Sequence, residues 1–399
     1  MNENWTDLFS YLRPSFNIPS RKVLSNRLLD AEYYKVKAIV DDKIESAPCV
    51  GVQLDSWTNI RNESIINFIV TTPTPVFLKS VSSEEKRHTT IYITKIISEV
   101  LDEISAPKVF GLCTDNATNM TSAWAALQAM DRFKHISFYG CSAHCLNLLA
   151  GDILTLKSSQ FILTQATRIV KHFRTKHVLN ALYRKYGRKQ LKLPVRTRWN
   201  TSLKCLDSLS EAKYSLQQIS VKEEVKNRID SEIKNVLLCD TSFWNNLEAI
   251  RGVLDPIAKR TTLLEGDKPQ LSFVPAAFVE IPDIILEKFL QYPYTERERS
   301  LIVNYIKNRK SFCLKSIHFA ANLLDPKFKG CSLSAVEELE ATELISIVAS
   351  TKKLNPGVVM AELSCYKVAH GGIFSKEFLW EAAKCCPTWI WWKGMCSST

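Results

Sequence analysis

Two aspartates that follow short apolar segments are the strongest candidates for chemistry in this chain. Asp55 comes after residues 50–54, and Asp115 comes after residues 109–114. Short apolar and β-branched runs that end at a polar cluster are typical of buried strands. In open α/β sheets, functional groups gather at the carboxyl ends of such strands. If the two strands are neighbours, the carboxylates together offer oxygen ligands to Mg²⁺ or Mn²⁺, which predicts a metal site for cutting nucleic acid.

Each aspartate also has a purely structural interpretation. Asp115 would then cap a helix that begins at Asn116, because a short acceptor side chain satisfies the free N–H groups at a helix start. Asp55 would close a turn at the end of its strand. The spacing alone leaves the metal-site and the structural interpretations both open.

The order of elements around the aspartates favours one fold. The apolar pattern predicts strands at 50–55, 65–71, 75–81 and 109–115, and helices at 90–104 and 117–130. The second and third strands are expected to be antiparallel, and a right-handed crossover brings the fourth strand beside the first. This is the ribonuclease-H-like arrangement, a mixed α/β sheet in which Asp55 lies beside Asp115.

The rest of the chain is predicted to be helical. Residues 141–187 read as long helix, and from 210 to about 350 the apolar residues recur at helical spacing. We therefore expect a helical arm, a ribonuclease-H-like core, an all-α insertion domain that interrupts it, and a short final segment. Their predicted bounds are 1–48, 49–210, 211–380 and 381–399.

The composition favours an intracellular protein that binds nucleic acid. The chain has 399 residues, which exceeds the usual size of a single core, and a formal net charge of +11. Such a charge favours a polyanion, of which nucleic acid is the commonest. We see neither a signal peptide nor an apolar run long enough to cross a membrane, so we expect a soluble chain whose twelve cysteines are thiols.

A basic stretch without any acidic residue is the main candidate for contacts with DNA. It runs from Arg168 to Arg198 and contains Lys171, Arg174, Lys176, Arg184, Lys185, Arg188, Lys189, Lys192 and Arg196. Phosphates would offset the mutual repulsion of these charges. Tyr183 and Tyr186, which lie among them, would stack on exposed bases. The alternative is a solvated helix face whose positive excess is incidental.

Trp199 and His144 are further candidates. Trp199, flanked by Arg198 and Asn200, would stack on a flipped base, or else it is a core residue. His144 would contact a phosphate or support Asp115, or else it is a buried helix histidine. With Cys141 and Cys145 it resembles only half a zinc site, so zinc is not expected.

The carboxyl-terminal end carries an unusual aromatic segment, Trp389-Ile390-Trp391-Trp392. Four large apolar side chains do not stay exposed on a soluble monomer. They are expected to dock on the chain's own core or on a second subunit, which makes a homo-oligomer possible.

Taken in order, these segments resemble the hAT superfamily of DNA transposases, in its plant-type branch and its zinc-finger BED-associated relatives. The resemblance rests on short motifs spread over most of the chain: residues 13–16 (RPSF), 54–58 (LDSWT), 114–120 (TDNATNM), 141–148 (CSAHCLNL), 198–200 (RWN), 243–244 (FW), 264–267 (LEGD), 324–326 (LDP) and 391–392 (WW).

The resemblance implies a nuclear protein that binds DNA, with a ribonuclease-H-like core and a DDE-type site. Asp55 and Asp115 would hold two Mg²⁺ or Mn²⁺ ions. Trp199 would stack against the flanking DNA, and His144 would contact the scissile region.

Three family features are not found in the sequence: a BED finger, the third carboxylate (a Glu beyond the Trp-Trp motif) and the dimerisation region. Glu377 and Glu381 precede Trp391 and are in the wrong place to replace that Glu. We therefore expect a transposase-derived DNA-binding protein that is truncated or inactive for cleavage and strand transfer. The alternatives are an active metal nuclease and a non-catalytic regulatory protein.

Overall fold

The computed structural model describes residues 3–396, except 73, 83–88, 187–188, 196–198, 226, 267 and 290–293. It divides into two compact units, Met1–Phe138 and Tyr139–Thr399, and each is described by itself. The predicted domain bounds at 49, 210 and 380 stay predictions. Among the described residues, no helix is both long and apolar enough to span a membrane.

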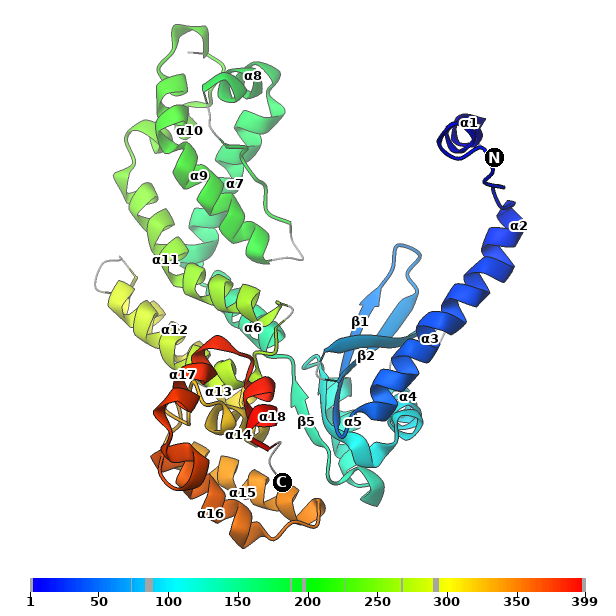
Figure 1. The fold of residues 1–399 in the computed structure, drawn as a ribbon. Coiled ribbons are helices and arrows are strands. Elements are labelled where there is room, and N and C mark those ends of the chain that lie inside the picture. The colour runs from blue at the N-terminus through cyan, green and yellow to red at the C-terminus, as the bar shows by residue number, and fades with distance from the viewer. Residues whose placement is uncertain are drawn as a thin grey trace. The chain divides into compact units, whose positions relative to one another are not determined.

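The first unit contains helices before and between the strands of a mixed sheet (Figure 1). Its elements are α1 (Glu3–Leu12), α2 (Arg21–Val23), the π-helical turn η1 (Leu24–Leu28), α3 (Leu29–Ser46), β1 (Val50–Thr58), β2 (Ser64–Thr71), β3 (Pro75–Ser82), α4 (Thr90–Ile104), η2 (Ala106–Lys108), β4 (Val109–Thr114), α5 (Thr118–Gln128), η3 (Asp131–Phe133) and β5 (Ser137–Gly140), which crosses into the second unit.

The sheet has the order β3-β2-β1-β4-β5, with β1–β2 and β2–β3 antiparallel and β1–β4 parallel. This confirms the predicted α/β fold class with its ribonuclease-H-like strand order. Alternate residues of the strands are buried, among them Leu54 and Phe68, and they share a hydrophobic cluster with α4 and α5. The opposite face of the sheet carries the more exposed side chains. Alternation thus fixes which residues face away from the core.

The prediction of continuous helix from 141 to 187 was wrong in detail. Strand β5 precedes this region, and three helices fill it, α6 (Ser142–Leu154), α7 (Lys157–Thr175) and α8 (His177–Tyr186). A strand of four residues is too short to give a clear alternation signal. The breaks at Thr155 and Lys176 contain neither proline nor glycine, so the usual helix-stop signals are missing.

The second unit is built mainly of helices. Beyond α8 they are α9 (Trp199–Ser220), η4 (Glu223–Val225), α10 (Ser231–Leu238), α11 (Thr241–Leu264), η5 (Leu271–Phe273), α12 (Val274–Phe289), α13 (Glu296–Cys313), α14 (Ser316–Leu324), α15 (Ala335–Thr351), α16 (Pro356–Val368), η6 (Gly372–Ser375), α17 (Glu377–Cys385) and α18 (Thr388–Cys396). Ion pairs tie these helices together; Arg309, for example, donates to both carboxylate oxygens of Asp152, at 2.7 and 3.0 Å.

The carboxyl-terminal aromatic segment docks on the chain itself. Trp391 is 2% exposed, and its indole N–H donates to Leu379 O at 2.7 Å. The indole N–H of Trp392 donates to Leu324 O at 2.9 Å. Both rings pack on Tyr366. Trp389 and Ile390 remain 42% exposed each.

A buried polar cluster at the centre of the second unit contains His318, which the sequence did not single out. Its Nδ1 accepts from the N–H of Lys315 at 3.1 Å, and its Nε2 lies 3.3 Å from Ser142 Oγ. Cys145, three residues after Ser142 on α6, donates to Arg309 O at 3.4 Å. Burial lowers the pKa of His318 from 6.5 to about 4, so the ring is neutral at physiological pH.

This burial predicts a pH-dependent stability. Since His318 has a higher pKa in the unfolded chain, the unfolded chain takes up the proton first as the pH falls below 6.5. The free energy of unfolding should therefore fall by about 2 kcal/mol between roughly pH 7 and pH 5 from this residue alone. Urea denaturation of the wild type and of His318→Asn measures this, and the variant should show a flatter pH profile. Equal slopes would contradict the assignment.

Candidate functional site

Asp55 and Asp115 lie at the same end of two neighbouring parallel strands. The β1–β4 register pairs Val52 with Leu112 and Gln53 with Cys113. Asp115 directly follows the end of β4, and continuing this register two residues past its last pair would set Asp55 opposite Asp115. Neighbouring strands are about 4.8 Å apart, so the two carboxylates are within reach of one cation.

Both carboxylates bond to nearby backbone and to no cationic side chain of the described residues. Asp55 Oδ1 accepts from the N–H of Ser56 at 2.9 Å, and Asp115 Oδ1 accepts from the N–H of Ala117 at 2.8 Å. Asp55 is exposed and Asp115 is partly exposed. The helix after Asp115 begins at Thr118, not at Asn116, and its cap residue is Ala117. Asp115 therefore stabilises the turn before the helix without being its cap.

The donor set suits a hard divalent cation only in part. Two carboxylates without a neutralising cation form an oxygen-only pair of the kind that Mg²⁺ and Mn²⁺ use. Within the described residues, however, no group of three or more His, Cys, Asp or Glu side chains is placed to hold a metal. Glu381, one of the two later carboxylates, pairs with Lys384 at 2.8 Å.

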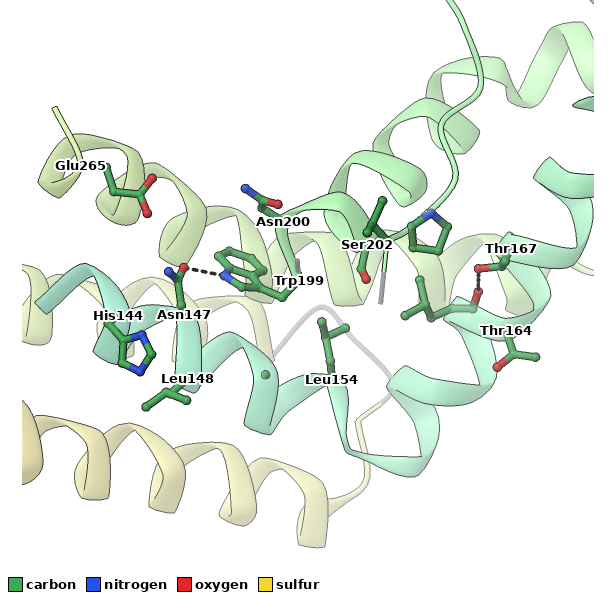
Figure 2. Close-up of a pocket in the computed structure, with 14 residues that line it drawn as sticks. His144, Asn147, Leu148, Leu154, Thr164, Thr167, Trp199, Asn200, Ser202 and Glu265 are labelled. Carbon is green, nitrogen blue, oxygen red and sulfur yellow. Dashed lines mark hydrogen bonds between the residues drawn. The ribbon is translucent and has the colours of Figure 1, made fainter. Parts of the chain in front are cut away.

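A second candidate site is a pocket of about 940 Å³ in the second unit, shown in Figure 2. Helices α6, α7, α9 and the end of α11 contribute its walls. It is lined by His144, Asn147, Leu148, Gly151, Leu154, Leu163, Thr164, Thr167, Pro194, Val195, Trp199, Asn200, Ser202 and Glu265. His144 on α6 is 55 residues before Trp199, the neighbour of Asn200 on α9, yet all three line one cavity.

Trp199 is held in a fixed orientation within this pocket. Its indole N–H donates to Asn147 Oδ1 at 2.6 Å (Figure 2). His144 stands one helical turn before Asn147 on α6, so both side chains lie on the same face of that helix. Trp199 is also the first residue of α9, whose N-terminal N–H groups favour an anion nearby. The pocket thus combines an aromatic face, an imidazole and a helix start.

The basic stretch is only partly neutralised by its surroundings. Arg168 bonds to Glu232 at 2.5 Å and to Asp230 at 3.3 Å, and Lys189 bonds to Glu211 at 2.8 Å. Other cations of the stretch are exposed and form no ion pair with any residue that the structure describes. These are Lys171, Arg174, Lys176, Arg184, Lys185 and Lys192, of which Lys176 donates to the backbone oxygen of Arg228 at 2.9 Å. Arg188, Arg196 and Arg198 lie outside the described residues.

The expected stacking role of Tyr183 was wrong. Tyr183 is 7% exposed, and its hydroxyl donates to Lys189 O at 2.6 Å. The side chain therefore anchors the end of α8 in the helical core and is not available to stack on a base. Tyr186 is 39% exposed and lies beneath the ammonium group of Lys222, at 4.2 Å from its ring centroid. The hydrogen bond from Lys222 lowers the pKa of Tyr186.

The candidate residues fall into both units. Asp55 and Asp115 belong to the first, and His144, Trp199, Asn200 and the basic stretch belong to the second. Sequence reasoning missed Asn147 and Glu265 in the pocket. Asn147 is one turn from His144 within the same motif, which is the one signal that could have indicated it.

The chain matches a family model over part of its length. A family model described as Domain of unknown function (DUF659) matches residues 19–169, and this domain is found in hAT-like transposase families. The matched region includes Asp55, Asp115 and His144 but ends before Trp199. None of the curated proteins compared with the chain matches it.

The facing carboxylates predict a small stabilisation when one charge is removed. Asp55→Asn should raise the free energy of unfolding by about 0.5 kcal/mol at low salt and without divalent cations, because it relieves like-charge repulsion. Denaturant unfolding at low and high salt measures the effect, which added salt should reduce. The control is Asp41→Asn, since Asp41 pairs with Lys37 at 3.1 Å and its loss should not stabilise the chain. A destabilised Asp55→Asn would contradict the facing geometry.

Proposed function

We propose that this chain is a transposase-derived DNA-binding protein of the hAT type that acts in the nucleus, with metal-dependent cleavage weak or lost. What supports it most is the parallel register of β1 and β4, which, continued past Gln53 and Cys113, brings Asp55 beside Asp115 inside the region matched by DUF659. Such carboxylates belong to enzymes that act on phosphodiesters. The basic stretch supplies the affinity for DNA that this chemistry requires.

The exposed cations of α7 and α8 are the proposed contacts to the DNA backbone. Lys171, Arg174, Arg184 and Lys185 project from consecutive helices that pack on one another, and Lys192 follows in the loop before α9. Their charges are not offset by carboxylates of the described residues. Phosphates would offset them and release counterions, which gives binding with a steep dependence on salt.

The pocket around Trp199 is the proposed site for an unpaired base next to a phosphate. The indole, held by Asn147, would stack on the base, as aromatic side chains do with bases that leave the helical stack. The start of α9 and His144 would face the phosphate. Glu265 adds a negative charge to the opposite wall, which would disfavour a second phosphate there.

Mg²⁺ or Mn²⁺, when bound, would polarise a phosphoryl oxygen and lower the pKa of a water molecule. Asp55 and Asp115 would hold the ion, and the backbone N–H groups of Ser56 and Ala117 would keep the carboxylates oriented. Two carboxylates hold a pair of ions less firmly than three, which is why we propose weak or lost cleavage. Zinc has no part in the proposal. Association of two copies would use Trp389 and Ile390.

Replacing basic residues should weaken DNA binding uniformly across sequences. The quadruple variant Lys171→Gln, Arg174→Gln, Arg184→Gln, Lys192→Gln removes phosphate contacts, so the magnitude of the slope of log K against log salt concentration should decrease by about 3.6. Fluorescence anisotropy with a labelled duplex measures it.

The matched control for this experiment neutralises four exposed lysines elsewhere in the second unit, Lys259, Lys307, Lys352 and Lys384. Their replacement by Gln changes the net charge equally and should leave the salt slope close to that of the wild type. A wild-type chain that does not bind duplex DNA at low salt would overturn the proposed function.

Trp199→Ala should weaken binding to DNA with an unpaired base by about tenfold, the usual contribution of one stacked base. Binding to fully paired duplex should change little, because the basic stretch is intact. Competition between the two DNAs measures the ratio, and Trp5→Ala, at an exposed tryptophan outside the pocket, is the control. Equal loss on both DNAs would count against the pocket as the base site.

A further inference from the structure

Asn67 lies directly opposite Asp55 on the neighbouring strand. The β1–β2 register pairs these two residues, and directly opposed residues of antiparallel strands place their side chains on the same face, with Cβ atoms about 4.5–5.5 Å apart. Asn67 is partly exposed, whereas its neighbours Ile66 and Phe68 are fully buried. The amide therefore stands on the open face of the sheet, beside the candidate metal site.

The amide of Asn67 has a fixed orientation. Asn67 is paired in register with Ser80 of β3, and the hydroxyl of Ser80 donates to Asn67 Oδ1. The amide oxygen is thus engaged on the β3 side, which leaves the NH₂ group for Asp55 on the other neighbouring strand. Polar side chains from three adjacent strands, Asp55, Asn67 and Ser80, are paired in one row across the sheet, and Asp115 follows the end of the next strand, β4.

An asparagine at this place is not explained by the strand itself. It is the one polar side chain between Ile65 and Val70, and asparagine is disfavoured in strands. A residue type that is unfavourable in its own secondary structure is expected where the side chain serves a function.

We propose that Asn67 is a positioning residue for Asp55. Its NH₂ group donates to the Asp55 carboxylate and holds it toward Asp115, so that both aspartates reach one divalent cation. Asp55 Oδ1 already accepts from Ser56, which leaves the second oxygen to the amide and the cation. Ser80 acts through Asn67 by fixing its orientation. The inference rests on the proposed metal site and adds the residues that shape it.

The test is titration of the full chain with Mn²⁺, followed by electron paramagnetic resonance of the free ion. Asn67→Ala should weaken Mn²⁺ binding about tenfold, as expected for one hydrogen bond to a charged group. Asn67→Val, which suits a strand and also lacks the amide, should do the same and guards against misfolding of the alanine variant. Ser80→Ala should have a smaller effect in the same direction.

Two further measurements separate positioning from a general structural effect. The double variant Asn67→Ala, Ser80→Ala should bind Mn²⁺ as Asn67→Ala does, because Ser80 acts through Asn67 and the two losses do not add. Gln53→Ala, on the same face of β1 but one row away, should bind like the wild type. Additive losses would overturn the proposed order of action.

Asp55→Asn makes failure of this inference distinguishable from failure of the metal site. If Asp55→Asn loses Mn²⁺ binding while both Asn67 variants bind like the wild type, the role of Asn67 is overturned and the metal site stands. If Asp55→Asn also binds like the wild type, the metal site itself is overturned, and the role of Asn67 with it.

Discussion

A β-bulge in the pairing of β1 with β4 determines whether this chain has a carboxylate pair at all. The register is Val50 with Val109, and then Gly51 with Gly111, so Phe110 is an extra residue in β4. Without that extra residue Asp55 would stand opposite Thr114, which is buried. A shift of one residue exchanges the two faces of a strand. The bulge therefore sets Asp115 opposite Asp55.

The close packing around the bulge depends on glycine. A Cβ atom at Gly51 would lie 2.6 Å from Thr71 Oγ1, a hydroxyl that donates to Gly51 O at 3.3 Å. Any larger residue would have to displace the Thr71 hydroxyl and break its hydrogen bond to Gly51 O. Bulges next to functional groups are common, since they redirect a side chain without breaking the sheet.

The sequence allowed the strand order to be predicted because each strand has strong alternation and the crossover helix α4 has a clear apolar face. Ile93, Ile97 and Leu101 are all fully buried, as their spacing indicates. The neighbourhood of Asp55 and Asp115 follows from that order. The bulge could not be predicted, because one extra residue does not alter the apolar pattern of a six-residue strand. Strand β5 was missed because four residues carry too little periodicity.

Contacts between side chains of different helices could not be predicted from the sequence either. Tyr183 was expected at a DNA surface, yet its helix face packs inward, and nothing local in the sequence distinguishes it from exposed Tyr186. The same holds for the contact of Trp199 with Asn147, which depends on how α9 packs near α6. His318 is neutral because it is buried. Its burial could not be predicted, because residues that surround it, such as Ser142, are far away in sequence. Patterns thus identify candidate residues, but tertiary packing decides which of them share a site.

The central claim, that Asp55 and Asp115 together hold a divalent cation, can be tested by locating the ion directly. Fe²⁺ in place of Mg²⁺, with ascorbate and peroxide, produces hydroxyl radicals that cleave the backbone close to the bound ion. Mass spectrometry of the fragments should find cuts near Asp55 and near Asp115 in the same preparation, and excess Mg²⁺ should suppress both. Cuts near only one of the two aspartates, or cuts elsewhere that Mg²⁺ suppresses, would contradict the claim.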